Sequence, residues 1–68
     1  MNIKAELREK LTIEEYNIAS YFIEKASKYY EEKNYEETRE ELVDAISVLK
    51  ANGEYTAAEK VEKYLEYC

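Results

Sequence analysis

Apolar residues recur along the chain at steps of three and four, which is the spacing of one face of an α-helix. Ile3, Leu7 and Leu11 begin this pattern near the N-terminus. No segment alternates apolar and polar residues for long enough to make a β-strand. The pattern therefore predicts an all-α protein with helices at about residues 2–11, 13–33, 35–51 and 54–67.

Short polar turns separate the expected helices. Thr12 and Glu15 fit a capping box, in which each side chain accepts a hydrogen bond from the other residue's backbone N–H. A new helix starts there, or one long helix is kinked there, since Thr12 is a weak break. Asn34 suits either the left-handed end of one helix or the cap of the next, and Gly53 suits a left-handed helix end. Connections this short make neighbouring helices antiparallel.

The expected architecture is a compact antiparallel bundle of three to four helices, in a single domain over residues 1–68. Its core is small, because only fifteen large apolar residues accompany the eight tyrosines. We expect several tyrosine rings to pack in this core with their hydroxyl groups directed to water. Residues 2–11 are too short to be stable alone. They either cover the bundle or exchange into a neighbouring copy, and we favour covering.

Composition excludes several kinds of chemistry. The chain has no His, Pro or Trp, one Gly and one Cys. It therefore lacks the residues for His-based catalysis, for most zinc sites, for a phosphate-binding loop and for an internal disulfide. We predict no enzymatic activity, no metal and no cofactor. The chain has no long apolar run, so we expect no membrane span and no secretory signal. The expected location is therefore the cytoplasm.

The charge balance points to protein partners. Formal net charge is −6, from 16 acidic and 10 basic residues, so nucleic acids and anionic membranes are not expected as partners. Acids are dense between residues 31 and 44. This stretch is either a docking face for a basic partner segment or a solvated face that keeps the protein soluble. The candidate partner-binding acids, all expected to point away from the core, are Glu36, Glu37, Glu40, Glu41 and Asp44.

Tyrosine is the other unusual feature, because eight are present and tyrosine is favoured at binding hot spots. Four tyrosines lie beside the two turns, where rim-of-core packing is expected: Tyr29, Tyr30, Tyr35 and Tyr55. The remaining tyrosines are less constrained, and at least one or two of Tyr16, Tyr21, Tyr64 and Tyr67 should be exposed enough to contact a partner. The candidates for that contact are Tyr21, Tyr64 and Tyr67. Abundant Lys and Glu, with no Gln, are typical of hyperthermophile proteins.

Part of the chain resembles one tetratricopeptide helix-turn-helix unit. The residues that carry the likeness are Phe22, Ala26, Tyr29, Tyr30, Asn34, Tyr35, Glu37, Thr38, Leu42 and Ala45. The chain departs from the family at Lys33, where the turn Gly is usual, and at Thr38 and Leu42, which replace an Ala and an aromatic residue. The turns near Asn34 and Gly53 are similar, and the tyrosines that follow them, Tyr35 and Tyr55, lie 20 residues apart. This spacing is shorter than the repeat of about 34 residues in that family.

Residues 25–68 also resemble the microtubule-interacting and trafficking domain, a small three-helix bundle. Ala26, the run 34–37, Ala45, Ala58 and the pair 64–65 carry this likeness. The link before the last helix, longer in that family, is shortened here to residues 52–53. The resemblance implies that a partner helix or peptide binds in a groove between helices.

These observations predict a small non-catalytic protein-interaction module. It would bind a partner helix or a basic peptide through an interhelical groove and the acidic face, either as a monomer or as a homodimer. The alternative is a self-associating, homodimeric structural subunit, because small cores often need oligomerisation and the groove would then be filled by a second copy.

Overall fold

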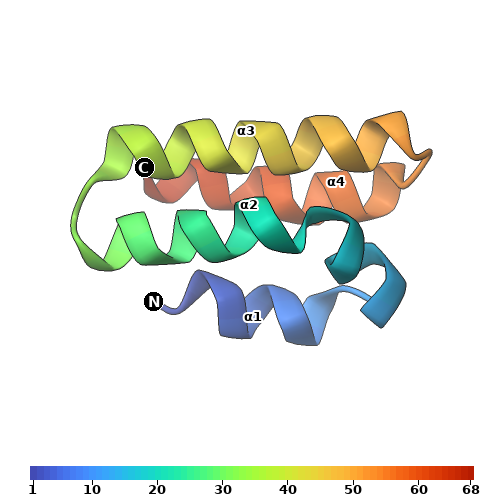
Figure 1. Cartoon of the computed structure of the whole chain (residues 1–68), viewed down its shortest axis with the longest axis horizontal. Helices are drawn as coiled ribbons and strands as arrows, with labels where there is room; N and C mark the ends of the chain where they lie inside the picture. Colours follow the sequence, from blue (N-terminus) through green and yellow to red (C-terminus); the bar gives the residue numbers. More distant parts are fainter.

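The computed structural model describes all 68 residues as helices joined by short turns (Figure 1). α1 spans Ile3–Lys10, α2 Ile13–Glu31, α3 Tyr35–Ala51 and α4 Tyr55–Glu62, and a 3₁₀-helix, η1, continues α4 over Lys63–Tyr67. The predicted all-α antiparallel bundle is confirmed. No helix combines the length and the apolar character needed to cross a membrane.

The helices form two layers. α2 and α3 make an antiparallel hairpin with the most extensive contact in the molecule (Figure 1). α1 packs on α2, α4 packs on α3, and α1 and α4 also contact each other. The second layer therefore covers one side of the hairpin, and no helix of the chain covers the other side.

The N-terminal segment covers the bundle, as expected. The capping box is present, since the backbone N–H of Thr12 donates to the Glu15 carboxylate at 2.9 Å and that of Glu15 donates to the Thr12 hydroxyl at 3.1 Å. Residues 11–12 lie outside both helices, so this is a break rather than a kink. Ile3 and Leu7 are fully buried in the core that all four helices share.

The turn after α2 places the left-handed residue one position earlier than expected. Lys33, not Asn34, has the positive φ of 61°. The backbone N–H of Asn34 donates to the Tyr29 carbonyl at 2.9 Å, and this Schellman-type closure ends α2 at Glu31 rather than at residue 33. The Asn34 side chain then caps α3, because it accepts from the backbone N–H of Glu37.

The turn after α3 repeats the same device. Gly53 has a φ of 77°, and the backbone N–H of Glu54 donates to the Leu49 carbonyl at 2.9 Å. Each turn is followed by a small residue that is fully buried, Thr38 in α3 and Ala58 in α4. The last helix departs from the prediction, because the α-helix tightens into a 3₁₀-helix after Glu62 instead of continuing to residue 67.

We predict that Leu42→Ala lowers the free energy of unfolding by about 2–5 kcal/mol, because Leu42 is fully buried and truncation leaves a cavity. Val43→Ala is the matched control at a neighbouring position that is 44 % exposed. It should change the stability by less than about 1 kcal/mol. Urea unfolding followed by circular dichroism measures both. Equal losses in the two variants would contradict the described core.

We predict opposite effects at the two left-handed positions. Lys33→Gly should stabilise the fold by about 1 kcal/mol, because glycine adopts positive φ without the steric cost of a side chain. Gly53→Ala should destabilise the fold by about 1 kcal/mol, because alanine adopts a positive φ only with strain. No atom lies within 4 Å of the added Cβ, so this backbone strain is the only expected cost. Lys28→Gly, inside α2, is the control and should destabilise by about 1 kcal/mol. Stabilisation by Gly53→Ala would overturn the assignment.

Candidate functional site

The outer edge of α3 carries an acidic surface. Glu40 and Asp44 are exposed and Glu37 is half-buried. None of the three takes part in an ion pair. Glu36 is exposed as well, and its place in the first turn of α3 is favourable for a negative charge.

The base nearest these acids in the sequence is directed elsewhere. The Arg39 guanidinium donates to the backbone carbonyls of Leu65 at 3.2 Å and Cys68 at 3.4 Å, which ties η1 to α3. Arg39 therefore holds the C-terminal turn and leaves the acidic surface without a neutralising partner.

The expectation that all five acids point away from the core is wrong for Glu41, which is only 8 % exposed. It lies three residues after Thr38 and four before Ala45, both fully buried, so the helix turns it toward the core seam. Its Oε2 lies 3.3 Å from Lys25 Nζ of α2, and this contact raises the pKa of Lys25. Its Oε1 is buried without a hydrogen-bond partner.

The Lys25–Glu41 pair links the acidic surface to exposed aromatic area on α2. Lys25 Nζ lies 4.8 Å from the centroid of the Tyr21 ring, which is a cation–π distance. Tyr21 is 66 % exposed and meets Phe22 edge to face at 5.3 Å. Glu37 and Asp44 lie one turn to either side of Glu41, so they border the same edge of the hairpin. We call Glu37, Glu40, Asp44, Tyr21 and Phe22 the acidic–aromatic face.

The other candidate tyrosines lie elsewhere. Tyr64 is 2 % exposed and its hydroxyl donates to the Glu6 carboxylate at 2.8 Å, so the expectation that Tyr64 contacts a partner is wrong. Tyr67 is exposed, but it belongs to η1 on the Arg39 side of α3, away from Tyr21. Exposure of one or two of these tyrosines is thus confirmed, and partner contact stays a prediction. Among the turn tyrosines, Tyr55 is exposed, whereas Tyr35 is partly exposed and its ring packs edge to face on Tyr30 at 5.3 Å.

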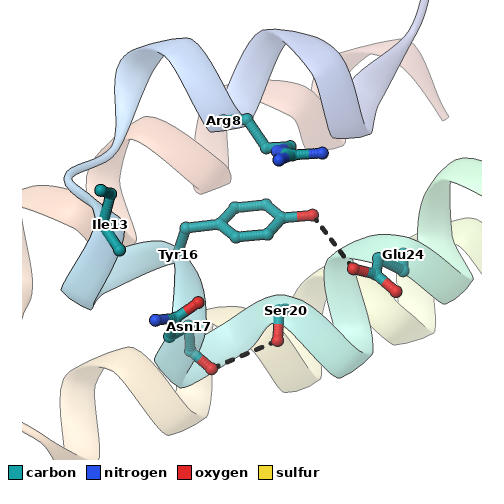
Figure 2. Close-up of a pocket in the computed structure, with 6 residues that line it drawn as sticks. All are labelled: Arg8, Ile13, Tyr16, Asn17, Ser20 and Glu24. Atoms are coloured by element: carbon teal, nitrogen blue, oxygen red, sulfur yellow. Dashed lines mark hydrogen bonds between the residues drawn. The ribbon is translucent and has the colours of Figure 1, made fainter.

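A polar cleft of about 410 Å³ lies between α1 and α2 (Figure 2). The Tyr16 ring lies between Arg8 on one side and Asn17 and Ser20 on the other, and its hydroxyl points to Glu24 (Figure 2). Burial raises the pKa of Tyr16. The sequence carries no signal for this cleft, because Arg8 and Glu24 come from different helices and match no motif.

Basic residues gather on a further side, where Lys10, Lys60 and Lys63 line a cleft of about 260 Å³. Lys60 Nζ donates to the backbone carbonyl of Lys10 at 3.1 Å, so this cluster serves to cap the end of α1. No group of three or more His, Cys, Asp or Glu side chains is placed to hold a metal ion.

We predict that Tyr64→Phe lowers the free energy of unfolding by about 1–2 kcal/mol at neutral pH, because it removes the hydrogen bond to Glu6. Tyr67→Phe is the control, since Tyr67 is exposed, and it should have no measurable effect. Thermal and urea unfolding measure both. A loss of equal size in Tyr67→Phe would contradict the described role of Tyr64.

The same variant has an expected pH signature. Burial raises the pKa of Tyr64 above its ordinary value of 10.0, and the hydrogen bond to Glu6 adds to this rise against the opposing effect of the nearby Lys10 ammonium. The fold favours the protonated phenol, so this contribution is complete below about pH 10 and is lost as the pH rises through the folded pKa. The stability difference between the wild type and Tyr64→Phe should therefore narrow above about pH 10. A difference that grows there would contradict the assigned burial.

Comparison with known proteins adds no identification, because no family model matches the chain and neither a curated protein nor a solved structure matches it significantly.

Proposed function

We propose that this protein is a small non-catalytic interaction module that binds a basic, amphipathic helical segment of a partner protein on its acidic–aromatic face. One observation carries the proposal. The acids of this face have no ion-pair partner within the chain, and the Lys25–Glu41 pair connects their helix to Tyr21, a large aromatic side chain that is two-thirds exposed.

The electrostatics favour a basic partner. Glu36, Glu40 and Asp44 follow one another at steps of four along α3. Like-charge pairs at this spacing cost about 0.2–0.5 kcal/mol each in an isolated helix. A partner that supplies Lys or Arg side chains relieves this repulsion, and its approach is accelerated by the opposite charge.

The apolar part of the face supplies contact area that charge alone does not. Tyr21 is exposed, and Ile18, Phe22 and Val48 are partly buried against the core. The contact between Lys25 and Glu41 shows that these two residues lie at the same level of the antiparallel pair. A step of three residues toward the start of α2 therefore matches a step of three residues toward the end of α3. Phe22 is thus level with Asp44, which places an aromatic anchor beside an acid, a combination suited to the alternating apolar and basic positions of an amphipathic helix.

The shape of the molecule and its resemblances support the same choice. The hairpin side opposite α1 and α4 carries no helix of this chain, so one surface of the helix pair is left uncovered. The likeness to a tetratricopeptide hairpin and to the microtubule-interacting and trafficking domain also implies binding of a helix or peptide.

A foreign partner is favoured over a second copy. A symmetric dimer built on this face places the same acids of the two copies near each other across the interface. Like charges facing each other disfavour such an association. The self-associating subunit is therefore the weaker candidate.

We predict that reversing Glu37, Glu40 and Asp44 to Lys weakens binding of a synthetic amphipathic Lys/Leu helix by at least about tenfold. Tyr21→Ala should weaken it to a similar extent, because it removes the exposed aromatic anchor. Titration calorimetry at physiological salt measures the affinities.

The charge control reverses three exposed acids on other helices, Glu9, Glu59 and Glu62. The aromatic control is Tyr55→Ala, because Tyr55 is similarly exposed.

The two controls decide the interpretation. The proposal requires that both control variants bind the helix within about threefold of the wild type. If the control charge reversal weakens binding as much as reversal at the face, the attraction is non-specific and the proposal is wrong. If no variant binds more weakly than the wild type, the face is not the binding surface.

A further inference from the structure

The cleft between α1 and α2 contains a cation whose hydrogen-bonding capacity is unused. The Arg8 guanidinium forms neither an ion pair nor a hydrogen bond within the chain, although it carries five N–H donors. The Arg8 side chain is nevertheless held in position by the Tyr16 ring, because the Arg8 Cζ lies 5.8 Å from the centroid of that ring. A guanidinium held over an aromatic ring with free donors is a suitable receptor for a carboxylate.

The opposite charge lies on the other helix of the same cleft. The Glu24 carboxylate is 3.5 Å from the Tyr16 hydroxyl and 3.9 Å from Lys4 Nζ, and both distances are at the outer limit of such contacts. Its oxygens therefore remain available to a stronger donor. Tyr16 is 9 % exposed, so the ring that separates the two charges is fixed by packing.

We infer that this cleft binds a small organic zwitterion, with its carboxylate on Arg8 and its protonated amine on Glu24. A simple anion is attracted by Arg8 but repelled by Glu24, and a simple cation experiences the reverse. A ligand that carries both charges satisfies both side chains at once. This site is lined by residues other than those of the acidic–aromatic face, and it does not depend on the proposed function.

The neutral lining suits the same class of ligand. The Asn17 side-chain amide makes no hydrogen bond within the chain, and the Ser20 hydroxyl donates to the Asn17 carbonyl and so keeps its acceptor capacity. Ile13 is exposed at the edge of the cleft and offers apolar contact to a ligand's carbon chain. The volume of about 410 Å³ lies in the lower part of the range of small-molecule sites.

The test is a titration of the full chain followed by two-dimensional ¹H–¹⁵N NMR. The probes are three amino acids of increasing chain length, glycine, 4-aminobutyrate and 6-aminohexanoate, and two singly charged analogues, butyrate and butylamine. The expected result is that at least one zwitterion shifts amide signals of residues 8–24 and binds at least about tenfold more tightly than either analogue. The inference is overturned if no zwitterion binds, or if the singly charged analogues bind equally well.

Variants locate the site. Arg8→Gln and Glu24→Gln should each weaken binding by at least about tenfold. Lys28→Gln and Glu59→Gln make the same charge changes at exposed positions outside the cleft and should leave binding unchanged. Arg8→Lys keeps the charge but removes the planar fork, so binding should fall to an intermediate level. Circular dichroism confirms folding of each variant. Equal weakening by the cleft variants and the control variants would overturn the inference.

Discussion

The close approach of α3 to both α2 and α4 is the constraint on which the rest of the structure depends. A chain of 68 residues has few large apolar side chains, so its helices must lie near one another to exclude water. Fully buried small residues at the contacts make this possible, among them Ala26, Thr38, Ala45 and Ala58. The Thr38 hydroxyl is accommodated because it donates to the Asn34 carbonyl at 2.8 Å. The resulting core extends to one side of the α2–α3 hairpin, where α1 and α4 complete it, and the other side stays open.

The same packing determines which basic side chains form contacts within the fold and which acidic side chains are left without a partner. Arg39 is used to hold η1, and Lys60 is used to cap α1, so these bases are unavailable to neutralise the outer edge of α3. Lys25 is the exception, because it crosses from α2 to the buried Glu41. Removing Lys25 leaves the Glu41 carboxylate without its counter-charge in a poorly solvated position, which is costly. The acidic surface is thus a consequence of where the bases are needed for structure.

Local signals in the sequence were sufficient for the fold but not for the site. The capping box at Thr12 and the left-handed Gly53 depend on neighbouring residues, and both were predicted correctly. The burial of Glu41 and Tyr64 was not predicted, because it depends on the rotation of each helix against its partner. Tyr64 is buried by contact with α1, whose Glu6 lies 58 residues away in the chain. The Arg8–Tyr16–Glu24 cleft was missed for the same reason, since only tertiary contact brings α1 to α2.

The central claim is that the open side of the α2–α3 hairpin is kept free for a different protein. Sedimentation equilibrium over a wide range of protein concentrations, with a reductant present to keep Cys68 from cross-linking two chains, tests it most directly. The account predicts the mass of a monomer at every concentration, because self-association on the acidic–aromatic face brings like charges together. A stable dimer whose dissociation is promoted by Tyr21→Ala would contradict it, since the open side would then be occupied by a second copy of the chain.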